Sequence, residues 1–60
     1  MNDELLSIHD VVKASGVTSR TLRHYDEIGL LKPANVGHGG VRFYSHANLL
    51  RLQQILLLRE

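Results

Sequence analysis

Residues 16–33, GVTSRTLRHYDEIGLLKP, contain one short helix together with its start and stop signals. Thr18 is a good N-cap residue, because its hydroxyl can accept a hydrogen bond from a backbone amide of the first helical turn. Gly29 suits the left-handed backbone position that commonly follows the last turn of a helix. These signals predict a helix over residues 19–28. Its inward side, at helical spacing, is expected to carry Leu22, Tyr25 and Ile28.

An earlier helix is expected directly before this one. Ser7 is a second N-cap candidate, and apolar residues follow it at i, i+3 and i+4 spacing up to about Ser15, with Gly16 as the stop. Two helices joined by a tight glycine-containing turn form the helix-turn-helix pattern, whose second helix enters the major groove of DNA with its N-terminal residues toward the bases. Any small helical hairpin can show this pattern. The residues on the polar face of the second helix are therefore needed to distinguish a DNA-binding motif from an ordinary hairpin.

That polar face is rich in hydrogen-bond donors. Arg20 and Arg23 are predicted to contact DNA rather than to be solvated surface charges, because a guanidinium fork matches both phosphate oxygens and the acceptor edge of guanine. Thr18 and Ser19 are cap residues first, and a capped helix N-terminus also directs free amides and partial positive charge at a phosphate. The whole predicted donor set is Thr18, Ser19, Arg20, Thr21, Arg23 and His24.

A hairpin of wing type is expected after the second helix. Pro33 cannot continue a helix, and residues 34–40 carry three glycines, which is typical of a turn between two short extended segments. Lys32 lies near the start of this hairpin, and residues 41–44 form its return strand.

Alternation in the return strand puts Val41 and Phe43 on one face and Arg42 and Tyr44 on the other. Arg42 is predicted to contact DNA for the same reason as the helix arginines. A tyrosine can bury its ring and keep its hydroxyl at the surface, and we expect the Tyr44 hydroxyl to contact a phosphate in this way.

Tyr25 and Asp26 are expected to have internal roles. Tyr25 should pack its ring inward and offer its hydroxyl to the DNA backbone. Asp26 should form an ion pair with an arginine such as Arg23 or Arg42 and fix the orientation of its guanidinium group. The remaining expected core residues are Leu22, Ile28, Phe43, Leu49 and Leu52.

A third helix follows Ser45, a further N-cap candidate, and its apolar surface is too wide for one face of so small a domain. Something else is expected to cover part of it. The pattern is still helical at Glu60, so we expect the chain to be the front piece of a longer protein. The apolar residues of this helix are Leu49, Leu50, Leu52, Ile55, Leu56, Leu57 and Leu58.

Two motifs resemble those of MerR-family transcription regulators. Residues 16–33 contain a string very similar to the family signature R-T-L-R-x-Y-[DE]-x-x-G-L-[LIV]-x-P. Residues 41–45, followed by Asn48, Leu49 and Leu52, are similar to the family's R-x-Y-[ST] wing strand and the helix after it. The resemblance covers residues 7–60, and two motifs in the right order and at the right separation are far more specific than one.

The resemblance implies a mainly α fold, a winged helix-turn-helix of three helices plus a short β-hairpin wing, over residues 1–60. It implies a homodimer on a pseudo-palindromic element of double-stranded promoter DNA, formed by a long downstream helix that these residues lack, as they also lack the effector domain. Such regulators distort an over-long promoter spacer so that RNA polymerase can engage it, and act as cytoplasmic transcriptional activators.

His24 departs from the family pattern, because many members have an aromatic pair before the acidic residue. A histidine can still donate to a phosphate, so the contact is expected to survive with a dependence on pH.

Other classes of function find little support in the sequence. There is no cysteine, and the four histidines have no metal-ligand spacing, so neither a metal nor a cofactor is expected. No nucleophile elbow, phosphate loop or carboxylate pair accompanies the serines and acids, so we expect no enzyme. The longest apolar run, residues 55–58, is far shorter than a membrane span.

Two alternatives stay open beside the promoter-binding regulator. One is a protein-interaction module on the same fold, with the leucine-rich third helix as its contact surface. The other is an excisionase-like architectural DNA binder, which shares the fold and lacks an effector domain.

Overall fold

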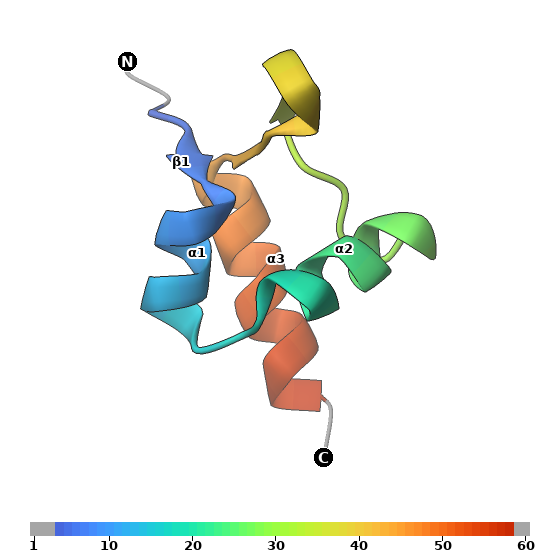
Figure 1. The fold of residues 1–60 in the computed structure, drawn as a ribbon. Helices are drawn as coiled ribbons and strands as arrows, with labels where there is room; N and C mark the ends of the chain where they lie inside the picture. The colour runs from blue at the N-terminus through green and yellow to red at the C-terminus, as the bar shows by residue number, and fades with distance from the viewer. Residues whose placement is uncertain (1–3, 59–60) are drawn as a thin grey trace.

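Three helices surround a small core, with a short sheet at one end of the molecule (Figure 1). The structure is a computed structural model that describes residues 4–58. The predicted fold class, three helices and a hairpin wing, is confirmed. In chain order the elements are β1 (Leu6–Ser7), α1 (Ile8–Ser15), α2 (Ser19–Glu27), β2 (Asn35–Val36), a 3₁₀ turn (His38–Gly40), β3 (Arg42–Tyr44) and α3 (His46–Leu58).

The predicted helix signals of α1 and α2 are confirmed. The Ser7 hydroxyl accepts a hydrogen bond from the Asp10 amide at 3.2 Å, and the Thr18 hydroxyl accepts one from the Thr21 amide at 3.1 Å. Gly16 ends α1 in the left-handed region, with φ of 78°. Gly29 adopts φ of 75° just after α2, a conformation that costs a residue with a side chain about 1–2 kcal/mol.

The sheet has three antiparallel strands in the order β1-β3-β2. The pairing of β2 with β3 forms the predicted wing, and the 3₁₀ turn lies at its tip. Leu6 pairs with Tyr44 on the other side of β3, so β1 fastens the start of the chain to the wing strand. β1 was not predicted, because two residues are too short to show a periodic pattern.

Each helix and the wing strand contribute to one apolar core. Leu22 and Tyr44 are both 0% exposed, and Leu52 is 1% exposed. Leu49 is half-buried and packs against this core, so three of the five expected core residues, Leu22, Leu49 and Leu52, are confirmed. The buried cluster consists of Val11, Val17, Leu22, Tyr25, Leu31, Tyr44 and Leu52.

The predicted core position of Ile28 is wrong, since this side chain is 59% exposed. α2 ends at Glu27, and the left-handed turn at Gly29 reverses the chain before the helical face continues. The amides of Leu30 and Leu31 both donate to the Tyr25 carbonyl, at 2.8 and 3.2 Å. This turn brings Leu31, 3% exposed, into the core in place of Ile28.

The predicted inner face of the wing strand is also wrong. The alternation of β3 holds, but Tyr44 lies in the core, while Phe43 is only half-buried and lies over Gly37 of the wing. A Cβ atom on Gly37 would lie 3.0 Å from the Phe43 ring, so the absence of a side chain there lets the ring approach. Phe43 is therefore a wing residue and not a core residue.

Ser45 and Asn48 cap α3 reciprocally. The Asn48 amide donates to the Ser45 hydroxyl at 3.2 Å, and the Ser45 amide donates to the Asn48 side-chain carbonyl at 2.8 Å. The Asn48 side-chain amide also donates to the Lys32 carbonyl at 2.9 Å. Because of this second bond, the start of α3 also holds the segment that leads from α2 into the wing.

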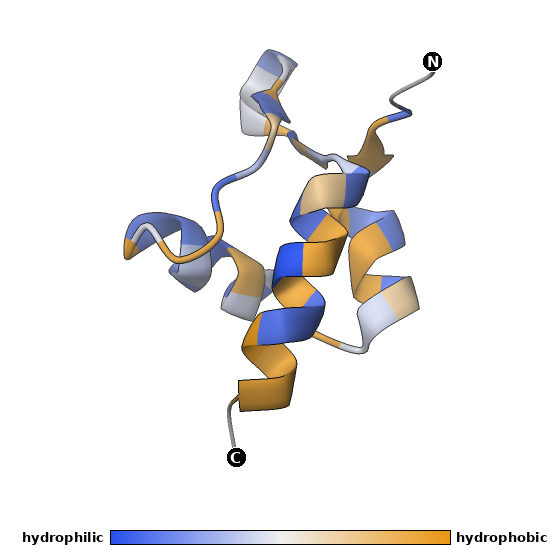
Figure 2. Cartoon of the chain, turned by 180° about the vertical axis from the view of Figure 1, so that it is seen from behind, coloured by the Kyte–Doolittle hydropathy of each residue, from blue (hydrophilic) through white to orange (hydrophobic). Residues whose placement is uncertain are grey.

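The last turns of α3 leave apolar side chains in solvent, as the sequence predicted. Leu57 and Leu58 are 83% and 84% exposed, and Leu50 is 63% exposed. Figure 2 shows the final turn of α3 as uniformly hydrophobic. No helix within residues 4–58 is long and apolar enough to cross a membrane.

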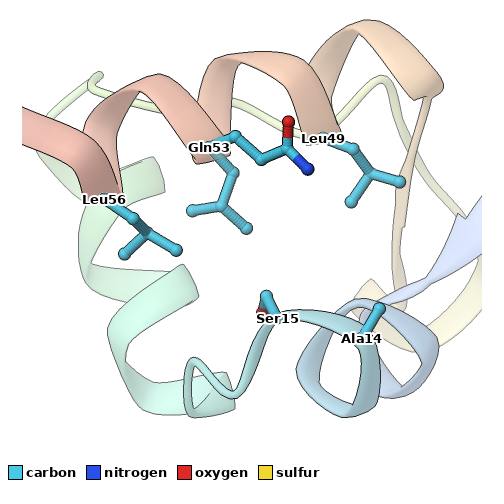
Figure 3. Close-up of a pocket in the computed structure, with 6 residues that line it drawn as sticks. Ala14, Ser15, Leu49, Gln53 and Leu56 are labelled. Carbon is cyan, nitrogen blue, oxygen red and sulfur yellow. The ribbon is translucent and has the colours of Figure 1, made fainter.

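A groove of about 280 Å³ lies between the end of α1 and one side of α3 (Figure 3). Its only polar side chains are Ser15 and Gln53, and the Ser15 hydroxyl already donates to the Val11 carbonyl at 2.7 Å. The groove offers no acid, base or charged group for chemistry. It is lined by Ala14, Ser15, Leu49, Leu52, Gln53 and Leu56.

Candidate nucleic-acid interface

The exposed side of α2 carries the donors that the sequence singled out. Arg20, Arg23 and His24 are exposed, and no hydrogen bond or ion pair to another residue of 4–58 occupies their side chains. Leu22 and Tyr25 take the opposite, buried side of the same helix. This division follows from helical periodicity, because residues three apart lie on one face. α2 thus presents a continuous row of free cationic and polar groups.

The N-terminus of α2 lies at the surface. Thr18 and Ser19 are exposed, and the Thr18 hydroxyl donates to the Thr21 hydroxyl at 3.0 Å while capping the Thr21 amide. The first intrahelical bond runs from the Leu22 amide to the Thr18 carbonyl. The amides before it have no carbonyl of an earlier helical turn to bond, and they carry the positive end of the helix dipole.

Arg42 of the wing strand forms an ion pair with Asp26 of α2. The Arg42 Nε atom donates to Asp26 Oδ2 at 3.1 Å, and the two side chains are 24% and 22% exposed. Of the two arginines expected as partners of Asp26, the structure therefore selects Arg42 and leaves Arg23 in solvent. The pair joins two elements that are 16 residues apart in sequence.

Tyr44 does not reach the surface, so the expectation that its hydroxyl lies at the surface is wrong. Its side chain is 0% exposed, and its hydroxyl has no hydrogen-bond partner among the described residues. Burial raises the pKa of the Tyr44 hydroxyl, with Arg42 opposing and Asp26 adding to the rise, so the group stays neutral. The side chain points inward because Tyr44 is on the core side of β3, next to Leu6 of β1.

Tyr25 also belongs to the core, with 9% of its surface exposed. The predicted inward packing of its ring is confirmed, and the ring lies 6.5 Å from that of His24, centroid to centroid. The contact of its hydroxyl with DNA stays a prediction.

The part of the chain that the structure describes contains no cluster of metal-ligating side chains. No three residues among its histidines and acids come close enough together to hold a metal ion.

One positioning residue was missed by sequence reasoning. Asn48 bonds the carbonyl of Lys32 and so holds the chain between α2 and the wing. The S-x-x-N spacing of Ser45 and Asn48 resembles a capping box and signals the local half of this role. The hydrogen bond from Asn48 to Lys32 has no local sequence signal, because only the folded chain brings these two residues together.

An exposed row of donors on the second helix of a helix-turn-helix, with a β-hairpin wing bonded to that helix, defines the winged helix-turn-helix class of DNA-binding domain. The model of the MerR HTH family regulatory proteins matches residues 6–60. The chain therefore belongs to the MerR HTH family, and it comprises the DNA-binding domain of a transcriptional regulator.

Related proteins are regulators of transcription. The chain is 57% identical over 54 residues to the HTH-type transcriptional activator TipA of Streptomyces coelicolor, covering 90% of this chain and 21% of that protein. It is 53% identical over 53 residues to the HTH-type transcriptional regulator SkgA of Caulobacter vibrioides, covering 88% of this chain and 21% of that protein. The chain spans about a fifth of the length of these curated relatives.

Solved structures agree with the fold. The N-terminal part of the Bacillus subtilis multidrug transporter activator, MtaN, superposes with a TM-score of 0.78 at 51% identity, over 85% of this chain and 48% of that one. A MerR-family transcriptional regulator from Bacillus cereus gives a TM-score of 0.81 at 41% identity, over 90% of this chain and 40% of that one.

Proposed function

We propose that this domain binds a specific element of double-stranded promoter DNA, with α2 in the major groove and the wing against the phosphate backbone. The observation that carries this proposal is the row of free donors on α2. The wing lies beside this row, because Asp26 of α2 forms an ion pair with Arg42 of the wing strand. Its role is regulatory and not catalytic, and it acts in the cytoplasm. The proposed contact residues are Thr18, Ser19, Arg20, Thr21, Arg23, His24, Tyr25 and Arg42.

The domain is further proposed to be the N-terminal part of a longer regulator that works as a homodimer. Support comes from the relatives, which are about four times as long as this chain. A downstream helix would join two copies on a pseudo-palindromic element, and a further domain would bind the effector. The dimer would activate transcription by distorting the promoter for RNA polymerase, in keeping with the activator names of relatives such as TipA.

Binding to duplex DNA is expected to weaken steeply as salt is added. Each phosphate neutralised releases counterions, so contacts to two to four phosphates should lower the affinity about 10- to 150-fold between roughly 50 and 200 mM salt. Fluorescence anisotropy of a labelled mixed-sequence duplex, titrated with the 60-residue chain at several salt concentrations, measures this slope. An affinity that does not respond to salt would remove the electrostatic basis of the proposal.

The protein-interaction alternative rests on the exposed leucines of α3. It predicts no salt-dependent binding to DNA at all, and the same titration therefore separates the two functions. An architectural DNA binder would pass this titration and would differ from a regulator in its full-length gene, by the lack of an effector domain.

Replacing Arg20 should reveal whether α2 reads bases. Arg20→Ala is expected to cost about 1–3 kcal/mol on the cognate duplex and to relax the preference at one base pair, because a bidentate contact to guanine is lost. Arg23→Ala should weaken cognate and scrambled duplexes nearly alike, as expected for a phosphate contact. Competition binding on both duplexes measures the difference.

Arg51→Ala is the matched control, since it removes the same charge from an exposed site on α3. It should leave the ratio of cognate to scrambled affinity unchanged. An equal loss on both duplexes for Arg20→Ala would assign Arg20 to the phosphate backbone.

A further inference from the structure

The ion pair between Asp26 and Arg42 places a carboxylate beside an arginine that is proposed to meet DNA. Asp26 lies in the last turn of α2, and Arg42 is the first residue of β3. About a quarter of each side chain is exposed, 24% for Arg42 and 22% for Asp26. A carboxylate this close to the interface repels phosphates and, if charge alone matters, offsets the attraction of the arginine for them.

The bond leaves the phosphate-binding end of Arg42 free. It uses Nε, while the two terminal nitrogens make no hydrogen bond to any residue from 4 to 58. A guanidinium is planar and rigid, so holding Nε fixes the plane and direction of the remaining four N–H donors. A phosphate can therefore be met by an arginine that is already oriented.

The buried side chain of Tyr44 lies beside the ion pair of Asp26 and Arg42. Tyr44 lies two residues after Arg42, on the same face of β3, and its side chain is fully buried, so this face of the strand is shielded from solvent beside the ion pair. The charges of Arg42 and Asp26 act on the pKa of the Tyr44 hydroxyl in opposite directions, Arg42 lowering it and Asp26 raising it. Charge pairs interact more strongly when one side is shielded from water.

From this geometry we propose that Asp26 is a positioning residue for DNA binding: it orients the Arg42 guanidinium toward the backbone and holds the wing at a set distance from α2. This inference rests on the proposed function, because it concerns how the same interface binds. Asp26 touches no DNA itself. The bond makes α2 and the wing one unit, whose two contact sites need no ordering when DNA arrives.

The proposal reverses the sign expected for removing an acid from a DNA-binding face. On charge alone, Asp26→Ala should tighten binding, because one source of repulsion is gone. If Asp26 positions Arg42, the same change should weaken binding about threefold to tenfold, a typical range for coupled charge pairs. In an Arg42→Ala background the benefit of Asp26 is absent, so Asp26→Ala should then be neutral or should tighten binding.

A double-mutant cycle on the 60-residue chain tests this. Affinities for a labelled mixed-sequence duplex of about 20 base pairs, long enough for two turns of DNA, are measured at several salt concentrations for wild type, Asp26→Ala, Arg42→Ala and the double variant. Asp26→Glu should recover part of the loss. Arg42→Lys should make binding insensitive to Asp26, since lysine keeps the charge but lacks the planar fork.

Glu27→Ala is the matched control, because Glu27 is the exposed neighbouring acid on the same helix and makes no ion pair within the described chain. It should tighten binding or leave it unchanged. Circular dichroism of every variant checks that it is folded, and Asp26→Leu, which has a similar size and no acceptor oxygen, replaces Asp26→Ala if the latter unfolds.

Three outcomes are decisive. A loss with Asp26→Ala that disappears in the Arg42→Ala background, together with a shallower salt slope, supports the positioning role. Salt-dependent binding by wild type with no coupling between the two residues overturns the positioning role and leaves the proposed function in place. A wild-type chain that shows no salt-dependent binding overturns both.

Discussion

Shortening the promoter spacer by two base pairs should make transcription high without inducer and should turn the bound full-length regulator into a repressor. The proposed mechanism distorts DNA so that two separated promoter elements come into the relation that RNA polymerase requires. Removing two base pairs rotates one element relative to the other by about 70° and brings them about 7 Å closer. The shortened DNA would then already have the geometry that the protein otherwise has to impose.

The size of this effect follows from the cost of deforming DNA. A bend or kink over a site of this kind costs on the order of 1–6 kcal/mol, which is roughly a 5-fold to 10⁴-fold change in the population of the distorted state. Contacts from two copies of α2 and the wing would offset this cost. An effector then needs only to shift the balance between a relaxed and a distorted complex.

Transcription from the natural and the shortened promoter, measured with and without the full-length protein and its inducer, tests the mechanism. A spacer lengthened by two base pairs is the matched control and should be inactive in every condition. If the shortened promoter still required protein and inducer, recruitment of polymerase through a contact surface would replace distortion.

Joining the domain to the proposed downstream helix should tighten binding to an inverted repeat by a factor of about 10² to 10⁴. The 60-residue chain is expected to be monomeric or weakly associated, and one copy contacts only one half-site. Once two copies are tethered, binding of the first raises the effective concentration of the second, so the gain needs no new contact with DNA.

The comparison uses the 60-residue chain and a longer version with the downstream helix, on duplexes that carry one or two half-sites. The longer version should lose its advantage on the single half-site. Sedimentation of the short chain gives the independent check. A stable dimer at micromolar concentration would show that the exposed Leu50, Leu57 and Leu58 of α3 form an interface of their own.

Local signals accounted for the helices and for the exposed donors of α2. Ser7 and Thr18 accept hydrogen bonds from amides three residues ahead, and Gly29 takes the left-handed position after α2. Each of these features depends on a few consecutive residues, so the pattern of side chains carries the information. The outward side of α2 followed in the same way, because helical periodicity separates its arginines from Leu22.

Tertiary packing decided the features for which two local outcomes were equally good. Alternation in the wing strand allows either face to be the inner one, and packing of the helices in the core selects the face of Tyr44. As a result, the Tyr44 hydroxyl, which the sequence predicted to contact a phosphate, is buried, and Phe43 packs on Gly37. A strand has two faces, and only its neighbours in the fold distinguish them.

The sequence by itself determined where the helices begin, which side of α2 carries the exposed donors, and that a hairpin follows. The tertiary structure alone decided that Arg42 and not Arg23 pairs with Asp26, and that Leu31 and not Ile28 enters the core. The reason is the range of the interactions. Caps and helical faces are set within about one turn of chain, whereas an ion pair across 16 residues and the filling of a core depend on where the folded backbone brings distant side chains together.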